Sequence, residues 1–182
     1  MAHRNYLIEG VSGAGKTSVA TELDRRGFHV VHGDRVLAYQ GDPETGEPLP
    51  PERRSDDLLF RNDHHIWNPE EVRRLVADRS HPVTFFCGGS RNHGKFVHLF
   101  DAVFILEADW ATVERRLESR VDEWGAHPEE RALTRELHRT GRDQPDGVRI
   151  DATRPLAEVV DDILTRCGLP AAGLRHSDPA SN

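Results

Sequence analysis

An eight-residue stretch near the amino terminus combines residue types and a spacing that suit the binding of phosphate. Residues 10–17 read Gly-Val-Ser-Gly-Ala-Gly-Lys-Thr and fit the pattern G-x-x-x-x-G-K-[ST]. The glycines allow backbone N–H groups to turn inward around a phosphate oxygen. A helix that is expected to begin near Lys16 adds the positive end of its dipole. The stretch therefore predicts a phosphate-binding loop.

The same stretch predicts ATP and Mg²⁺ as cofactors. Lys16 is expected to reach the β- and γ-phosphate oxygens, and the Thr17 hydroxyl group is expected to ligate Mg²⁺. The alternative is a glycine-rich turn without a ligand. Because the chain contains two lysines, a chance match to the pattern is on the order of one in a thousand. The residues expected to hold the cofactor are Gly10, Ser12, Gly13, Ala14, Gly15, Lys16, Thr17 and Ser18.

Asp34 stands just beyond the second predicted strand, in the tripeptide His-Gly-Asp. In an open parallel sheet, ligands gather outside the carboxyl ends of the strands, so we expect Asp34 beside the phosphate loop. A carboxylate there can accept the proton of an attacking hydroxyl group and hold a water molecule of the Mg²⁺ shell. The alternative is an aspartate that binds N–H groups of its own turn. The neighbouring loop favours the first interpretation, so Asp34 is predicted as a catalytic, acceptor-binding and metal-binding residue.

Arginines after the fourth predicted strand are candidates for stabilising the charge that develops during phosphoryl transfer. Arg116 and Arg120 stand four residues apart on a predicted helix, and residues 121–127 have the composition of a loop. A lid of this kind can close arginine donors onto the phosphate oxygens and exclude water. Residues 116–135 are therefore predicted as a lid, with Arg120 as a catalytic residue and Arg116 as a nucleotide-binding residue.

Gly88, Gly89 and Arg91 follow the third predicted strand directly. We predict that they bind the acceptor, with Arg91 as a clamp for an anionic or polyhydroxylated molecule. A surface ion pair is an equally weighted role for Arg91. The adjacent His64 and His65 carry little weight as a metal pair, because the side chains of neighbouring residues diverge and no further Cys or His motif accompanies them.

Five short apolar runs are continuous rather than alternating, which is typical of strands buried on both faces. They cover residues 5–9, 28–32, 83–87, 102–106 and 148–150. Helical patterns cover residues 17–26, 68–76, 109–117, 128–137 and 155–167. The alternation of strands with helices predicts an α/β fold, a three-layer sandwich around a five-stranded parallel sheet.

Length and composition limit the domain organisation, the partners and the location that can be expected of the protein. The 182 residues, with a formal net charge of −7 and two cysteines, are expected to form one domain over residues 1–169. An excursion at 41–67 is expected to cover the acceptor, with Phe60 or Trp67 as a wall and core packing as the alternative role of both. A disordered tail is expected at 170–182. The acidic balance argues against nucleic acid and membrane surfaces as partners. Neither a membrane span nor a signal peptide is indicated, so a cytoplasmic location is expected, and the oligomeric state stays open.

These motifs resemble a group of small P-loop kinases that includes shikimate kinase, gluconate kinase and chloramphenicol phosphotransferase. The resemblance covers most of residues 5–167 and rests on the phosphate loop, on Gly33-Asp34, on the glycine pair after the third strand, on the lid and on residues 151–160. It implies a P-loop NTPase fold like that of nucleoside monophosphate kinases, and Asp34 as general base. It also implies an adenine ring near the last strand-to-helix junction, flanked by Arg154.

Three departures from this group leave the acceptor open. Shikimate kinases carry two acids around the end of the second strand and three glycines after the third, where this chain has His32 and Ser90. The lysine, tyrosine and arginine segment of gluconate kinases is not reproduced in residues 90–95. The resemblance therefore implies the fold and the reaction type but neither named substrate.

The sequence thus predicts an ATP-dependent kinase that phosphorylates a hydroxyl group of a small molecule, such as a sugar acid, a nucleoside or an antibiotic-like compound. A GTPase is disfavoured because the chain lacks N-K-x-D, and a motor-type ATPase because no acid ends the third predicted strand. Two alternatives stay open. One is a nucleoside monophosphate kinase, with Arg53, Arg54, Arg61 and Arg91 available for an acceptor phosphate. The other is a non-catalytic nucleotide-binding regulator.

Overall fold

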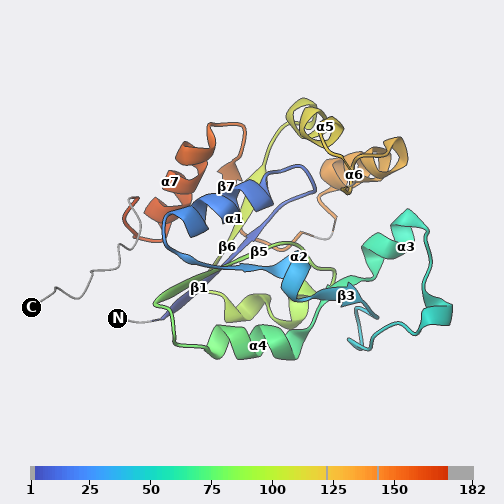
Figure 1. The fold of residues 1–182 in the computed structure, drawn as a ribbon, viewed down its shortest axis with the longest axis horizontal. Coiled ribbons are helices and arrows are strands. Elements are labelled where there is room, and N and C mark those ends of the chain that lie inside the picture. Colours follow the sequence, from blue (N-terminus) through green and yellow to red (C-terminus); the bar gives the residue numbers. More distant parts are fainter. Residues whose placement is uncertain (1–2, 122, 143, 172–182) are drawn as a thin grey trace, which may run out of the picture.

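Strands and helices alternate along the chain from β1 (Arg4–Glu9) to α7 (Leu156–Arg166) (Figure 1). The computed structural model describes residues 3–121, 123–142 and 144–171. Most of the predicted disordered tail, residues 172–182, therefore lies outside the described residues. Within the described ranges, no helix combines the length and the apolar character needed to cross a bilayer.

A five-stranded parallel sheet forms the centre of the molecule (Figure 1). Its order is β2-β5-β1-β6-β7, and every neighbouring pair is parallel. The strands that join β1 are β2 (His29–His32), β5 (Val83–Cys87), β6 (Ala102–Glu107) and β7 (Val148–Asp151). Every residue of β5 is buried, as is every residue of β1 after the first, because helices or loops cover both faces. The predicted five-stranded parallel sheet is confirmed.

The two faces of the sheet carry separate parts of the core. Tyr6 and Ile8 of β1 face the layer formed by α1 (Lys16–Arg25) and α7, where they join Val160 in one cluster of buried side chains. Leu7 faces the opposite side and belongs to a second cluster with Val72 of α4 (Pro69–Ala77). Figure 1 shows α1 and α7 on one side of the sheet and α4 on the other. The predicted three-layer sandwich is therefore also confirmed.

The predicted helix starts coincide with capping contacts. The side chain of Asn68 accepts hydrogen bonds from the backbone N–H groups of Glu70 and Glu71 at the start of α4. Asp109 accepts one from the N–H of Thr112. Such caps satisfy donors that have no partner inside the helix. The remaining helices are α2 (Gly33–Val36), α3 (Leu58–Asp63), α5 (Trp110–Glu118) and α6 (Pro128–Thr140), with short 3₁₀ segments at 51–53, 93–95 and 97–99.

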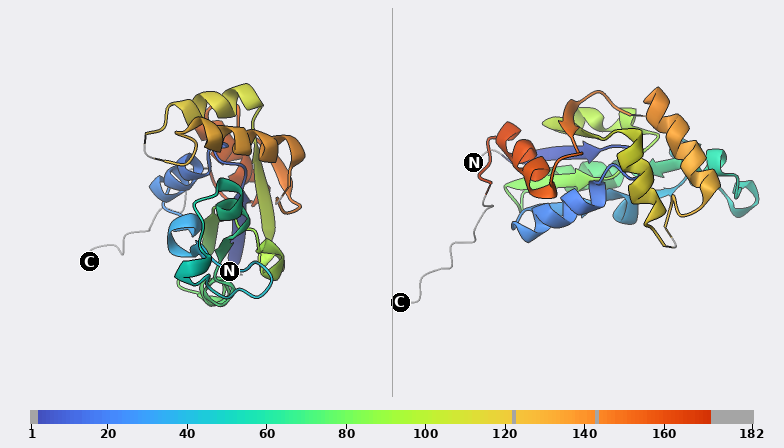
Figure 2. Two further views of the ribbon diagram at one scale, coloured as in Figure 1. Left: turned by 90° about the vertical axis from the view of Figure 1, so that its right-hand side faces the viewer. Right: turned by 90° about the horizontal axis from the view of Figure 1, so that it is seen from above.

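Residues 33–67 contain more regular structure than the sequence predicted. A short helix, α2, follows β2 directly, and β3 (Ala38–Gln40) pairs with β4 (His65–Trp67) in a separate two-stranded antiparallel sheet. Strands of three residues are too short for a periodic pattern, which is why the sequence predicted only an excursion at 41–67. Helix α3 contacts α6, and both lie at the end of the molecule that is far from the amino terminus (Figure 2).

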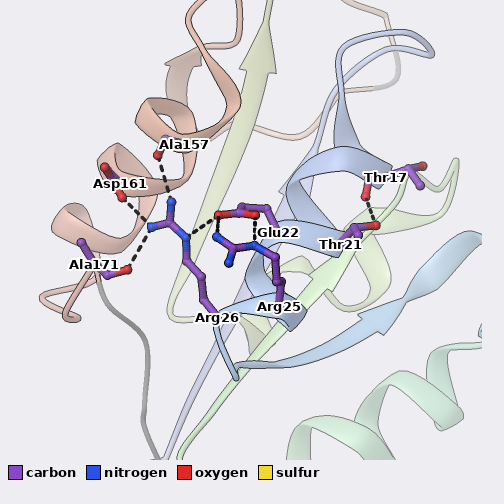
Figure 3. Close-up of polar contacts among 8 residues, drawn as sticks. All are labelled: Thr17, Thr21, Glu22, Arg25, Arg26, Ala157, Asp161 and Ala171. Carbon is purple, nitrogen blue, oxygen red and sulfur yellow. Dashed lines mark hydrogen bonds and ion pairs between the residues drawn. The ribbon is translucent and has the colours of Figure 1, made fainter.

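Arg26 connects α1 to α7 (Figure 3). Its side chain is only 10% exposed and contacts Glu22 at 2.8 Å and also Asp161 of α7. The exposed side chain of Arg25 forms an ion pair with the same glutamate. Hydrogen bonds from the two arginines outweigh burial and lower the pKa of Glu22 to about 2. The helix that carries the phosphate loop is therefore anchored at its far end.

Candidate active site

The predicted phosphate loop connects β1 to α1 and has the backbone that glycine permits. Gly13 and Gly15 have φ values of 84° and 111°, in the left-handed region that side chains disfavour. The loop and the first turns of α1 line a cavity of about 790 Å³. The predicted cofactor-binding residues found there are Ser12, Gly13, Ala14, Gly15, Lys16, Thr17, Ser18, Arg116 and Arg154, whereas Gly10 lines a neighbouring cavity.

Lys16 is half-buried where the loop meets α1. Its Nζ donates hydrogen bonds to the carbonyl oxygen of Gly10 and, at 3.2 Å, to that of Val11. Burial lowers the pKa of Lys16, and this effect outweighs the opposing charges of Asp34 and Glu9. The ammonium group thus lies among charged groups, with donors that can turn to an anionic ligand.

Both predicted lid arginines reach the phosphate loop. Arg116 of α5 donates to the carbonyl oxygens of Ala14 at 3.1 Å and of Ala152 at 2.8 Å, so it links the loop to the β7–α7 junction. Arg120 donates to the Oγ of Ser12 at 2.9 Å. These contacts place the Arg120 guanidinium at the loop. Arg154 lines the same cavity and donates a hydrogen bond of 2.9 Å to Asp162.

A second cavity, of about 380 Å³, adjoins the first. Three arginines line it: the predicted Arg91, with Arg61 from α3 and Arg142 beyond α6. Arg61 lies over the ring of Trp124, with its Cζ 5.7 Å from the ring centroid. The two cavities share four lining residues, Ser12, Lys16, Asp34 and Trp124.

Asp34 lies at this junction as predicted, at the carboxyl end of β2. Its Oδ1 accepts hydrogen bonds from the backbone N–H of Gly89 at 3.1 Å, from Nε2 of His65 at 3.3 Å and from Nε1 of Trp67 at 3.4 Å. Its Oδ2 has no hydrogen bond to the described part of the chain. Burial alone would raise the pKa of Asp34, but His65, the charge of Lys16 and the Gly89 N–H outweigh it, so the pKa is lowered.

Trp67 is fully buried next to this carboxylate, and its ring occupies space that two glycines leave free. A Cβ on Gly33 would lie 2.1 Å from the Trp67 ring, and a Cβ on Gly88 would lie 2.6 Å from the ring and 2.7 Å from Asp34 Oδ1. Gly88 lines neither of the two large cavities, so its role is to admit the ring and the carboxylate, while Gly89 lines the smaller cavity. Trp67 and Phe60, the expected cavity walls, line neither cavity.

Gly33→Ala tests the packing of the Trp67 ring against Gly33. We expect the added methyl group to displace the Trp67 ring and to lower the free energy of unfolding by about 1–3 kcal/mol or more, because overpacking of a dense core is destabilising. Urea denaturation measures the change. Gly94→Ala is the matched control, since a Cβ there meets nothing within 4 Å. Equal stability of the two variants would contradict the packing described here.

Several residues of the site were not found from the sequence. Glu9, the last residue of β1, is only 2% exposed and lines the smaller cavity, although a buried acid is rare. His65 contacts Asp34, although as part of a histidine pair it had been given little weight. Arg142 and Trp124 come from the segments around α6. Because these residues meet only through the tertiary fold, no local pattern pointed to them; the one available signal for Glu9 was its place directly before Gly10.

The fold is shared with solved kinase structures. A shikimate kinase from Bacteroides thetaiotaomicron has a TM-score of 0.60 at 12% identity over 91% of this chain and 99% of its own. A sugar kinase from Janibacter sp. HTCC2649 has a TM-score of 0.57 at 20% identity over 95% and 99%. A gluconokinase from Sinorhizobium meliloti 1021 has a TM-score of 0.53 at 22% identity over 89% and 90%.

Comparison of the structure finds similar proteins, whereas comparison of the sequence does not. No protein-family model matches the chain, and no curated protein sequence matches it. The alignments with the three solved structures cover nearly the whole chain. The chain therefore has the fold of the small P-loop kinases.

Proposed function

We propose that the protein is an ATP- and Mg²⁺-dependent kinase that transfers the γ-phosphoryl group to a hydroxyl group of a small molecule. The junction of the two cavities is the observation that supports this most. The larger cavity is lined by the phosphate loop, the smaller one by arginines, and both reach Lys16 and Asp34. A phosphoryl group at Lys16 would therefore face an acceptor beside Asp34.

Thr17 and Asp34 are the residues that would hold Mg²⁺. Both line a small cavity of about 40 Å³ that also includes Lys16. A hydroxyl and a carboxylate suit this ion, which takes one or two protein oxygens together with phosphate oxygens and water. When bound, the ion would neutralise charge on the phosphate oxygens. Lys16 and the loop N–H groups would position the phosphates for transfer.

Asp34 would orient the attacking hydroxyl group through Oδ2. Its lowered pKa keeps the carboxylate ionised at neutral pH and makes it a weak base. A weak base is sufficient, because the transition state of phosphoryl transfer is loose and little proton transfer is needed before the bond to the leaving group breaks. The hydroxyl proton would move to Asp34 late in the reaction.

The charge of the smaller cavity favours an anionic acceptor. Arg61, Arg91 and Arg142 line it, and arginine forks match carboxylate and phosphate groups. A sugar acid satisfies both the arginines and the need for a hydroxyl group at Asp34. The same arginines also support the second candidate, a nucleoside monophosphate kinase, whose acceptor is itself a phosphate.

An acceptor screen tests the proposal. ADP formation from ATP and Mg²⁺ is measured with gluconate, shikimate, deoxyadenosine, an aminoglycoside and AMP, each against a reaction without acceptor. We expect a hydroxyl acceptor, with an acid among the best, to raise the rate well above background. AMP as the best acceptor would favour the monophosphate kinase. ADP at background with every compound would contradict the proposal and favour the regulator.

Arg120→Met is expected to lower kcat about 10²- to 10³-fold and to change the Kd for ATP only slightly. The guanidinium lies at the Ser12 hydroxyl, where it would face charge that develops in the transition state rather than in bound ATP. ADP formation and calorimetric titration with ATP separate the two effects. Arg120 lies just beyond the end of α5, not on the helix as the sequence predicted. Arg115→Met is the matched control, because Arg115 is an exposed arginine in the last turn of α5. A similar loss of kcat in both variants would refute the role of Arg120.

A further inference from the structure

We propose that His65 is a positioning residue of the acceptor site. In its Nε2–H tautomer, the ring orients the Asp34 carboxylate through Nε2 and offers Nδ1 to a second hydrogen-bond donor on the acceptor. This inference rests on the proposed function for the identity of the bound molecule, whereas the geometry of the His65–Asp34 pair stands apart from it.

The partner of Nε2 fixes the tautomer. Nε2 lies 3.3 Å from Oδ1 of Asp34. An ionised carboxylate can only accept hydrogen bonds, so the proton of this contact must belong to the ring. The second ring nitrogen, Nδ1, is then left with a lone pair in the neutral ring.

The backbone of His65 is held on two sides, which limits where the ring can lie. His65 begins β4 and pairs with Gln40 of β3, and its carbonyl oxygen accepts a hydrogen bond of 2.9 Å from the N–H of Arg91. The side chain is 38% exposed and lines the smaller cavity. Within the described residues, Nδ1 has no hydrogen-bond partner.

Two acceptor atoms of neighbouring residues are therefore offered to the same cavity. Oδ2 of Asp34 is free to bind the hydroxyl group that attacks, and Nδ1 of His65 is free to bind a neighbouring hydroxyl or amino group of the same molecule. Arginines elsewhere in the cavity supply only donors. His65 thus adds an acceptor that the arginines do not offer, and it would select the orientation in which the correct hydroxyl group faces Asp34.

His64 is the natural comparison. It precedes His65 in the chain, but its Nδ1 lies 2.8 Å from the carbonyl oxygen of Phe60, and its ring stacks on the ring of Phe60 at 3.9 Å. It does not line the cavity. A change at His64 therefore perturbs the same segment without touching the carboxylate.

Two substitutions separate the two roles of the ring. The amide nitrogen of glutamine reaches about as far from the backbone as Nε2, so His65→Gln can still donate to Asp34 but has no atom at the place of Nδ1. The amide of asparagine reaches only as far as Nδ1, so His65→Asn keeps a polar atom there and loses the bond to Asp34. His64→Gln is the control, and thermal denaturation checks that all three variants fold.

Steady-state kinetics with gluconate, shikimate and deoxyadenosine give the first readout. We expect His65→Gln to keep kcat within about threefold and to raise the KM of the acceptor about fivefold, the effect of one lost hydrogen bond. His65→Asn should lower kcat about tenfold or more, because Asp34 is misplaced. Equal loss in both variants, or no loss in either, would overturn the proposal.

The second readout requires no turnover. ¹⁵N NMR of histidine-labelled protein at mildly alkaline pH distinguishes the tautomers, with His65→Gln assigning the signal. We expect the Nε2–H tautomer in the wild type, with an N–H signal that shifts and exchanges faster with water in Asp34→Ala. A predominant Nδ1–H tautomer would overturn the inference even if the protein is a kinase. If no acceptor is phosphorylated but the Nε2–H signal depends on Asp34, the proposed function fails and the geometry of the pair stands.

Discussion

Lys16→Met is expected to reduce phosphoryl transfer at least about 10³-fold. Nζ lies at the junction of the two cavities, and its hydrogen bonds to two loop carbonyl oxygens can be replaced by bonds to phosphate. Methionine has a similar length and no charge, so the variant removes the ammonium group from the site where negative charge moves from ATP to the acceptor. ADP formation measures the loss.

The chain supplies its own control for this variant, because it contains a single further lysine, Lys95. The Nζ of Lys95 donates to the carbonyl oxygen of Glu44, and the residue lines neither of the two cavities. Lys95→Met should retain the rate of the wild type. If Lys16→Met also retained it, the measured activity would belong to another site or to a contaminant.

Asp34→Asn is expected to lower kcat about 10²- to 10⁴-fold while the Kd for ATP stays within a few-fold. The amide can still accept the three hydrogen bonds that Oδ1 receives, so the seat of the side chain is retained. The second oxygen is replaced by an NH₂ group, which only donates hydrogen bonds and therefore cannot accept the proton of a hydroxyl group. Rapid-quench measurement of transfer and calorimetry with ATP separate these effects.

Asp56→Asn provides the matched change at an exposed aspartate of the same 33–67 segment, and we expect it to be neutral. Near-normal transfer by Asp34→Asn would remove the proposed role of the carboxylate and favour an acceptor that needs no base, such as a phosphate. A large loss of ATP affinity would instead mean that Asp34 acts mainly through the metal ion.

The parts of the fold that the sequence predicts are those with a strong local signal. The continuous apolar runs of β1 and β5 indicated buried strands, and Asn68-Pro69 marked the start of α4, because a capping side chain and a proline suit the same two positions. The place of Asp34 was predictable for a different reason. The carboxyl ends of parallel strands meet at one edge, so strand order was not needed to bring it near the phosphate loop.

The surroundings of Asp34 were not predictable, because they depend on contacts between distant residues. Trp67 stands 33 positions further along the chain, and nothing in its neighbourhood indicates that its ring N–H reaches this carboxylate. His65 belongs to a three-residue strand with no periodic pattern. Glu9 ends β1 after three apolar residues, at a position where an acid suggests exposure, yet it is 2% exposed.

Residues of the 33–67 segment both line the smaller cavity and bind the Asp34 carboxylate, and this has a consequence for protein engineering. A loop that covers an acceptor can be transplanted from one enzyme to another in order to change substrate preference. Here the same segment carries Asp34, on which transfer would depend, together with His65 and Trp67, whose ring N–H groups bind its carboxylate. A transplant would therefore alter turnover along with preference. Redesign for a new acceptor should instead begin with Arg61, which lines the cavity and makes no hydrogen bond to Asp34.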